Sequence, residues 1–229
     1  MHLSLHPDFQ VRQFTIGREG APLIVIDNFL ADAEQLVDIA AGKLFGPTTR
    51  LYPGIRAPAP LLYQNFFSAN IQSVLAQAFG RPARPLQFTM CHFSLITTPT
   101  DKLHILQRIP HVDSLGMNEL AAIHYLFKAD HGGTAFYRHR KTGFEFVDQS
   151  RKDTYFRSLE SENDGPNMPA PEYINGDTPL FEQIEKQDGV FNRVLIYRRN
   201  SLHSGCIGRD FIPDPNPRTG RLSINSFIE

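Results

Sequence analysis

The clearest helical spacing of apolar residues lies in the first third of the chain. A compact apolar run over 22–30 predicts a strand. Apolar positions then recur at helical spacing between Asp32, a suitable N-cap, and Gly42, a suitable helix end, so a helix is predicted there. A second helix is predicted over 71–79, where Gly80 would end it. Both helices are interpreted as scaffold.

Strand patterns dominate from residue 86 onward. The predicted strands cover 88–96, 109–113, 121–127, 132–137, 192–197 and 221–228, and an edge strand is expected within 9–18. Residues 48–60, rich in Pro and Gly, are expected to form a loop, and 153–159 and 179–187 are candidates for short helices. Helices first and short strands after favour an α+β, mainly β domain whose strands close on themselves.

The whole chain, 1–229, is interpreted as one domain. Residues 1–85 would supply N-terminal strand and helix support, and 86–229 would form the β core. Within that core, 138–190 holds charged residues, Pro and Gly and is longer than an ordinary connection, so this insertion is the candidate lid over a substrate.

Composition narrows the class of protein without changing this architecture. Hydrophobic residues make up 41% of the chain and charged residues 21%, as in ordinary soluble domains. The 23 Lys and Arg nearly balance the 24 Asp and Glu, so no summed charge favours nucleic acid or an anionic membrane as a partner. Two cysteines, Cys91 and Cys206, are too few for a disulfide framework, and no targeting or membrane-spanning pattern is present, so a cytoplasmic protein is expected.

Candidate chemistry begins with His111 and Asp113. Side chains two residues apart on a strand share a face, so this imidazole and this carboxylate can reach the same ion. A second imidazole from a distant segment would complete the three-ligand face of a non-haem iron site with open positions. The pair alone is a weak signal in a chain with nine His.

The order of further motifs resembles one family. Tyr125-Leu126 ends a predicted strand, Gly132-Gly133-Thr134-Ala135-Phe136 follows, and His203 lies downstream after a further strand. This order resembles the Fe(II)/2-oxoglutarate-dependent dioxygenases, in particular the branch similar to prolyl 4-hydroxylases. The opening 24–30 followed by a helix is similar too, so the resemblance spans about residues 22–228.

The resemblance implies a fold, a metal and a cosubstrate. The fold is a double-stranded β-helix, jelly-roll or cupin-like, with the N-terminal helices packed on one sheet. The implied metal ligands and catalytic residues are His111, Asp113 and His203, which would bind Fe(II), while 2-oxoglutarate and O2 would take the open positions.

The far carboxylate of 2-oxoglutarate needs a fixed cation, and the planar fork of Arg suits it. Arg221 and Ser223 share a strand face and match an Arg-x-Ser element of the family, although prolyl 4-hydroxylases usually have a Lys nearer to the distal His. Arg218 is the alternative clamp. Tyr125 could add a hydroxyl hydrogen bond to the cosubstrate, and a core tyrosine is the other interpretation.

The resulting hypothesis is an oxidoreductase that couples oxidative decarboxylation of 2-oxoglutarate to hydroxylation of an amino-acid side chain or small metabolite. The substrate is expected to be a small molecule or a peptidyl group, and the loops that would select it carry no shared motif. Two alternatives stay open. One is a catalytically silent metal- or ligand-binding β-helix domain, and the other is a Zn-dependent hydrolase that uses the same two His and one Asp.

Overall fold

Strands contain more residues than helices in the computed structural model, which describes residues 2–49, 51–80, 85–162 and 167–229. The larger sheet contains β1 (Gln10–Ile16), β2 (Ala21–Asp27), β3 (Gly46–Pro47), β4 (Gly54–Pro58), β5 (Phe88–Ile96), β6 (Leu120–Tyr125), β9 (Val194–Arg198) and β11 (Leu222–Ile228). The smaller sheet contains β7 (Gly133–His139), β8 (Phe181–Asp188) and β10 (His203–Cys206). The helices are α1 (Glu34–Ala41), α2 (Leu61–Phe79), α3 (Lys152–Glu162) and two short 3-10 turns, Thr100–Lys102 and Ile105–Gln107.

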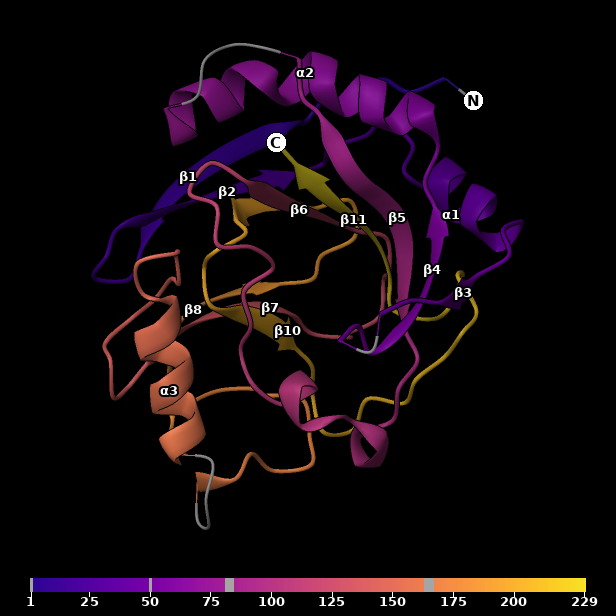
Figure 1. Ribbon diagram of the computed structural model, residues 1–229. Helices are drawn as coiled ribbons and strands as arrows, with labels where there is room; N and C mark the ends of the chain where they lie inside the picture. Colours follow the sequence, from indigo (N-terminus) through magenta and orange to yellow (C-terminus); the bar gives the residue numbers. More distant parts are fainter. Residues whose placement is uncertain (1, 50, 81–84, 163–166) are drawn as a thin grey trace.

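The chain crosses repeatedly between the two sheets. The order of the larger sheet is β1-β2-β9-β6-β11-β5-β4-β3, and that of the smaller sheet is β10-β7-β8. After β5 the chain reaches the edge of the smaller sheet, where His111 bridges His203, and then returns to the larger sheet as β6. It crosses again between β6 and β7, between β8 and β9, and on either side of β10 (Figure 1).

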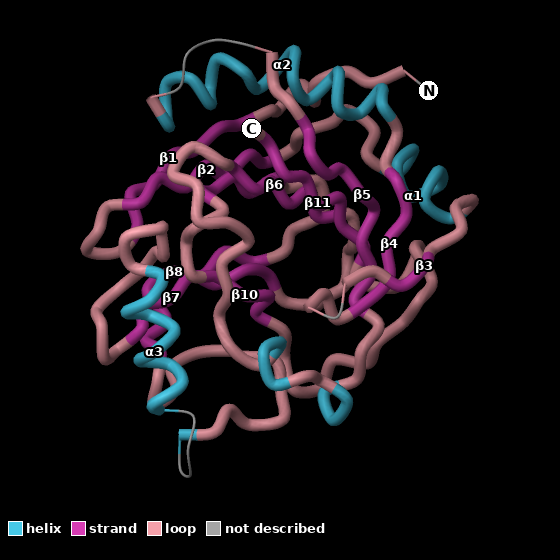
Figure 2. Tube along the Cα trace, viewed as in Figure 1, coloured by secondary structure: helices cyan, strands magenta, loops and turns pink. Residues whose placement is uncertain are grey.

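This crossing pattern, with every pair antiparallel, is that of a jelly roll, and the predicted fold class is confirmed. The expectation that the strands close on themselves is wrong. Within the described residues the two sheets stay separate and form no closed barrel. Figure 2 shows the loops that join them.

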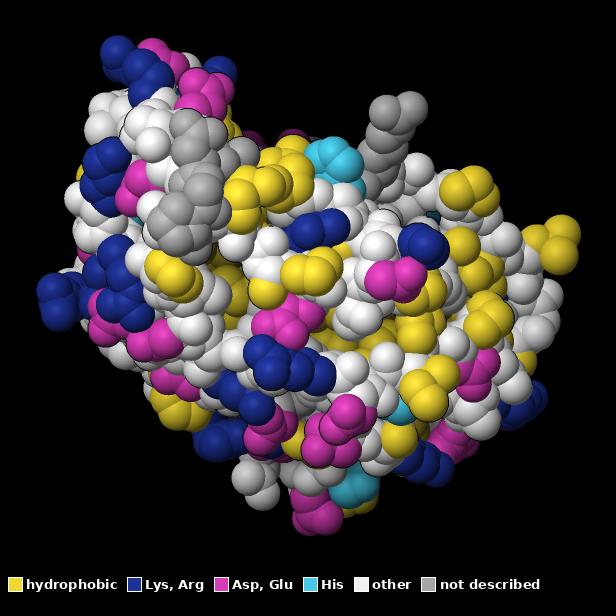
Figure 3. All heavy atoms as spheres, turned by 90° about the horizontal axis from the view of Figure 1, so that it is seen from below, with side chains coloured by type: hydrophobic (Ala, Val, Ile, Leu, Met, Phe, Trp, Pro, Cys, Tyr) yellow, Lys and Arg dark blue, Asp and Glu magenta, His cyan; other side chains and the backbone are white. Residues whose placement is uncertain are grey.

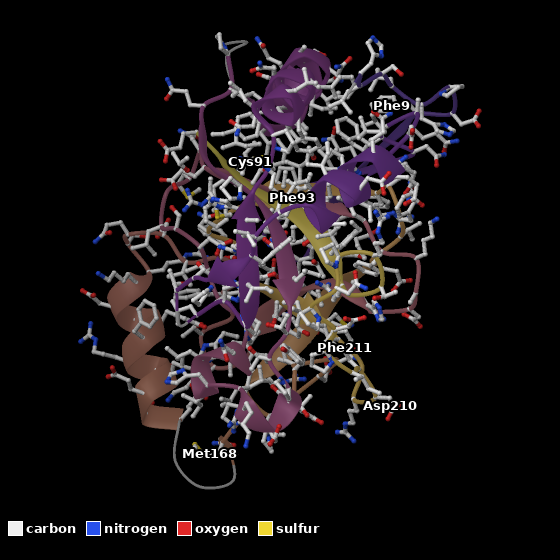
Figure 4. The ribbon with its side chains drawn as sticks, turned by 90° about the vertical axis from the view of Figure 1, so that its right-hand side faces the viewer. Phe9, Cys91, Phe93, Met168, Asp210 and Phe211 are labelled. Atoms are coloured by element: carbon white, nitrogen blue, oxygen red, sulfur yellow. The ribbon has the colours of Figure 1, made fainter. Side chains whose placement is uncertain are left out.

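The larger sheet separates an apolar core from an inner, more polar face. On β5, Cys91, Phe93 and Leu95 belong to the cluster that packs under α1 and α2, and Phe67 of α2 is fully buried in it. Figure 4 shows Cys91 and Phe93 in the half of the molecule that carries α1 and α2. Because side chains alternate along a strand, the residues between them face the smaller sheet. They are Met90, His92, Ser94 and Ile96, and all of them except Ser94 line a cavity.

The predicted C-terminal ends of the first two helices are confirmed, and the predicted N-cap is wrong. Gly42 follows α1 as its C-cap, and Gly80 adopts a left-handed conformation (φ 63°) at the end of α2, so both predicted stops are confirmed. The N-cap of α1 is Ala33 rather than Asp32, whose carboxylate accepts a hydrogen bond from the Gln35 side chain.

Three local predictions differ from the structure. The candidate helix over 179–187 is replaced by β8, because pairing with β7 along its length outweighs the helical preference of its Glu, Lys and Gln residues. The predicted loop over 48–60 contains β4 at the edge of β5. The predicted strand over 109–113 is reduced to one bridge between His111 and His203.

Glu145 ties the N-terminal hairpin to the smaller sheet. Its carboxylate accepts hydrogen bonds from the backbone N–H groups of Arg18 and Glu19, both at 2.9 Å, in the turn between β1 and β2. It also accepts from Arg138 of β7, and Arg138 bonds Glu182 of β8 at 2.6 Å. The hairpin is therefore held by a buried charge network as well as by strand pairing.

Among the residues that the structure describes, no helix combines the length and the apolar character needed to cross a membrane.

Candidate metal centre

His111, Asp113 and His203 converge at one end of the smaller sheet. Their ligand atoms all lie within 4.8 Å of one another. Nε2 of His111 is 3.7 Å from one oxygen of Asp113, and Nε2 of His203 is 3.4 Å from the other. Atoms that bind one ion at about 2.1 Å and at right angles would be about 3 Å apart, so only a small adjustment separates this arrangement from ligation.

Backbone hydrogen bonds position the three side chains. The N–H of His111 donates to the carbonyl of His203 at 2.9 Å, and the N–H of His203 donates back to His111 at 3.0 Å. The N–H of Asp113 donates to the carbonyl of Arg199 at 2.8 Å. Two segments far apart in the chain are thereby fixed against each other at the ligands, without a regular strand over 109–113.

The protonation states favour a cation. Nδ1 of His203 lies 2.9 Å from the carbonyl oxygen of Ser201, so this nitrogen carries the proton and Nε2 keeps its lone pair. Burial and the neighbouring His203 lower the pKa of His111 to about 4, which leaves a neutral imidazole at pH 7. Burial acts to raise the pKa of Asp113, but the neighbouring His203, His111 and Arg199 lower it to about 2, so Asp113 is a carboxylate. The set therefore offers two imidazole nitrogens and one carboxylate as ligands.

Arg199 bonds the backbone of Asp113, and the sequence motifs did not identify this arginine. Its Nη2 donates to the Asp113 backbone carbonyl at 3.2 Å, and its Nη1 donates to Glu119 at 2.8 Å. Its guanidinium also lies 4.0 Å from the centroid of the Phe227 ring. No spacing in the sequence links Arg199 to Asp113, because the contact arises only when the strands pair.

The three residues face a cavity of about 760 Å³ between the sheets. Its walls come mainly from the inner face of the larger sheet, from the segment around His111, and from α3. Among the described residues that line it, Asp113 is the only carboxylate. The size is that of a site for small molecules.

Arg221 lines the same cavity and is buried. Its Nε and Nη2 donate to the carbonyls of His131 and Gly133, both at 2.8 Å, which fixes the guanidinium plane. In the part of the chain described, no carboxylate lies within ion-pair distance of it. Ser223, also in the wall, donates to the Asn225 side chain at 2.8 Å. Arg221 is thus an anchored cation with no compensating charge.

The other cosubstrate candidates lie elsewhere. Tyr125 is fully buried and bonds the hydroxyl of Thr134 at 2.7 Å, so Thr134, rather than Tyr125, presents its hydroxyl to the cavity. Arg218 lies at the surface, pairs with Asp38 at 2.6 Å and is not part of the cavity wall. Of the predicted cosubstrate residues, the structure brings Arg221 and Ser223 to the cavity.

The predicted lid, 138–190, is only partly a separate segment. It begins within β7 and includes β8, and its residues 163–166 lie outside the described part of the chain. Within it, Tyr155, Phe156 and Leu159 of α3 line the cavity, and Tyr173 does so as well. The insertion therefore contributes an aromatic wall to the cavity.

These residues fit a divalent metal and a keto acid. A His, His, carboxylate set suits non-haem Fe(II) and leaves positions open. An anchored, uncompensated arginine in the same cavity suits the far carboxylate of 2-oxoglutarate. When bound, this pair supplies oxidative chemistry that no side chain in the cavity can supply alone.

The face drawn in Figure 3 shows no large patch of a single charge. There, basic and acidic side chains are interspersed, and hydrophobic side chains gather in the centre and on the right.

Solved structures with a similar fold include non-haem α-ketoglutarate-dependent enzymes. One is HygX from Streptomyces hygroscopicus with nickel, 2-oxoglutarate and hygromycin B bound, at 12% identity, a TM-score of 0.48, and 92% and 83% coverage of this chain and of HygX. A Pseudomonas putida prolyl-4-hydroxylase is 13% identical with a TM-score of 0.40, and the alignment covers 90% of this chain and 91% of the hydroxylase. The epimerase SnoN from nogalamycin biosynthesis is 13% identical with a TM-score of 0.45, and the alignment covers 87% of this chain and 70% of SnoN. At such identities and TM-scores below 0.5 these likenesses stay descriptive, and the fold rests on the strand pairing given above.

No curated protein matches the chain. One family model does, over residues 7–228, which is nearly the whole length. The chain therefore belongs to the family described as "Family of unknown function (DUF6445)".

Proposed function

We propose that this protein is an Fe(II)- and 2-oxoglutarate-dependent oxygenase. The observation that carries the proposal is the presence, in one cavity, of a converged His111, Asp113, His203 set and a buried, uncompensated Arg221. The ligand set alone would suit other metal enzymes, and a buried arginine alone would suit any anion. Together they match the two ends of a chelating keto diacid.

Each residue has a defined part in this proposal. His111, Asp113 and His203 hold Fe(II), with Nε2 of His203 directed at the ion by the bond from its Nδ1 to Ser201. Arg221 binds the distal carboxylate of 2-oxoglutarate, and Ser223 and the Thr134 hydroxyl line its path. Arg199 keeps Asp113 in position.

The proposed reaction is a hydroxylation. One atom of O2 enters succinate as 2-oxoglutarate loses CO2, and the other atom enters a C–H bond of the substrate, which becomes an alcohol. The aromatic residues Tyr155, Phe156 and Tyr173 beside the cavity limit the access of water during the reaction. The substrate is a small molecule or a peptidyl side chain that fits a cavity of about 760 Å³.

The two alternatives fit less well. A zinc hydrolase needs a general base beside the metal-bound water, and Asp113 is the only carboxylate among the described lining residues. A silent binding domain has no need of a buried arginine fixed by two carbonyls in the same cavity as a complete ligand set.

The test is an anaerobic titration of the purified protein with Fe(II) and then 2-oxoglutarate, in which the visible charge-transfer band of the chelated keto acid is recorded. The wild type is expected to develop the band. His111→Ala is expected to lose it through loss of the metal, and Arg221→Gln through at least about tenfold weaker 2-oxoglutarate binding.

Arg218→Gln is the matched control, because it removes a surface arginine outside the cavity and is expected to titrate like the wild type. A protein that binds metal but gives no band at saturating 2-oxoglutarate contradicts the oxygenase proposal. Hydrolysis of a substrate by the zinc form, unaffected by Arg221→Gln, would support the hydrolase instead.

A further inference from the structure

A second arginine lines the cavity and lacks a charged partner. Arg56 of β4 is half-buried, and its Nε donates to Ser94 Oγ at 3.2 Å. Its guanidinium lies 3.9 Å from the centroid of the Tyr52 ring, and its Nη1 is 3.3 Å from the Met90 sulfur, which is a weak acceptor. These contacts hold the side chain in place without neutralising it.

The absence of a counter-ion matters at Arg56 because this arginine lines the cavity. Eight arginines pair with carboxylates within 4.0 Å. Arg56 and Arg221 both line the cavity, and neither has such a pair among the described residues. Partly desolvated cations without partners are costly, so an anion is expected to occupy each of them in the working protein.

The two arginines serve different ends of the cavity. Arg56 reaches along β5 from Ser94 toward Met90, and Met90 pairs with Phe227 near the end of β11. Arg221 precedes the first residue of β11, which pairs with Leu95. The guanidinium of Arg56 therefore points away from Arg221 along the same sheet, and one small diacid that already chelates the metal cannot satisfy both.

A charge count leads to the same conclusion. A divalent ion with Arg56 and Arg221 brings four positive charges to the cavity, and Asp113 and 2-oxoglutarate bring three negative ones. One positive charge is left at Arg56. On this side of the cavity the wall includes the apolar residues Pro58, Met90, Ala121, Ile123 and Phe227 and the polar residues His92, Asn225 and Ser226.

We propose that Arg56 binds a carboxylate of the primary substrate, which is a small carboxylic acid with an apolar body. The inference rests on the proposed function for the role of the metal and of Arg221. The carboxylate lies against the Arg56 guanidinium, and the apolar body lies along the Met90 end of the cavity and carries the C–H bond that is to be oxidised.

The test uses hexanoate and phenylacetate as probes, each beside its neutral primary amide. Binding is measured by ligand-observed NMR on the zinc-loaded protein, with and without 2-oxoglutarate, for the wild type, Arg56→Gln, Arg56→Lys and Arg218→Gln. The 2-oxoglutarate affinity of every variant is measured in parallel. Far-UV circular dichroism confirms that each variant is folded.

The wild type and Arg218→Gln are expected to bind the acids at least about tenfold more tightly than the amides. Arg56→Gln removes that preference and leaves the 2-oxoglutarate affinity within about twofold, whereas Arg56→Lys retains part of the preference because it keeps the charge.

Three outcomes overturn the inference: equal or absent binding of acid and amide by the wild type, an unchanged preference in Arg56→Gln, or loss of 2-oxoglutarate binding in Arg56→Gln with retention in Arg221→Gln. The last would make Arg56 the cosubstrate clamp. Failure of the proposed function is distinct, because then no variant, including the wild type, binds 2-oxoglutarate. An acid preference that depends on Arg56 would still support a carboxylate site in that case.

Discussion

The substitution Glu145→Gln tests the buried charge network that holds the N-terminal hairpin. The Glu145 side chain is 2% exposed and that of Arg138 is 9% exposed. Glutamine keeps the shape but removes the charge, and if its carbonyl stays toward Arg138, its NH2 group faces the N–H of Glu19. One donor then meets another where a hydrogen bond existed.

The magnitude follows from these contacts. Loss of one partner of a buried pair typically destabilises a protein by about 3–5 kcal/mol. Arg138 keeps its bond to Glu182, so the lower end of that range applies, and the lost bond to Glu19 adds about 1 kcal/mol. The free energy of unfolding is expected to fall by about 3 to 4 kcal/mol.

The assay is urea unfolding followed by circular dichroism at neutral pH. Glu182→Gln is the matched control, since it removes the other carboxylate from the same arginine, but from a side chain that is 36% exposed. It is expected to change the unfolding free energy by about 1 kcal/mol or less. A Glu145→Gln effect no larger than the Glu182→Gln effect would refute the reasoning.

Three further predictions concern stability. Burial lowers the pKa of His124 to about 4, so as the pH falls below about 6.5 the unfolded state takes up this proton first. The contribution of His124 to the free energy of unfolding is therefore full above about pH 6.5 and decreases by about 3 kcal/mol between that pH and pH 4. Urea unfolding at pH 7 and at pH 4.5 should show a smaller loss of unfolding free energy in His124→Gln than in the wild type. Gly132 has a φ of +72°, and Gly132→Ala places a Cβ 1.9 Å from the Cys206 carbonyl oxygen. It should therefore lower the melting temperature far more than Gly143→Ala, where φ is +73° but no atom lies within 4 Å of the new Cβ. Equal decreases in melting temperature would contradict a steric clash at Gly132. Phe67→Ala should lower the free energy of unfolding, measured with urea, by about 3–5 kcal/mol, because Phe67 is fully buried. Leu61→Ala, at an exposed position on the same helix, should lower it by about 0.5 kcal/mol. Similar values for the two variants would mean that the core under α2 is not packed as described.

Elements with a clean local pattern were predictable from the sequence. The alternation along 88–96 predicts β5 with its bounds, and it also separates Phe93, on the helix side, from His92, on the cavity side. The spacing of His111 and Asp113 predicts a shared face, and the structure brings both together with His203.

Features that depend on pairing between distant strands were not predictable. Arg56 lies in a Pro- and Gly-rich stretch that reads as a loop, and only its pairing with Ser94 makes it part of the cavity wall. Arg199 acquires its role because the backbone brings Asp113 to it. β8 has a polar sequence without β preference, and it is a strand because β7 lies beside it.

The mutual backbone bonds between His111 and His203 also bear on how the protein folds. The proposed metal ligands come from the middle of the chain and from its last quarter, so the set is complete only after β10 has joined β7. Contacts of such long sequence separation form late, after the loss of chain entropy on loop closure. A bound ion would therefore stabilise the native state more than the transition state for folding. Metal loading is expected to slow unfolding while leaving the folding rate nearly unchanged.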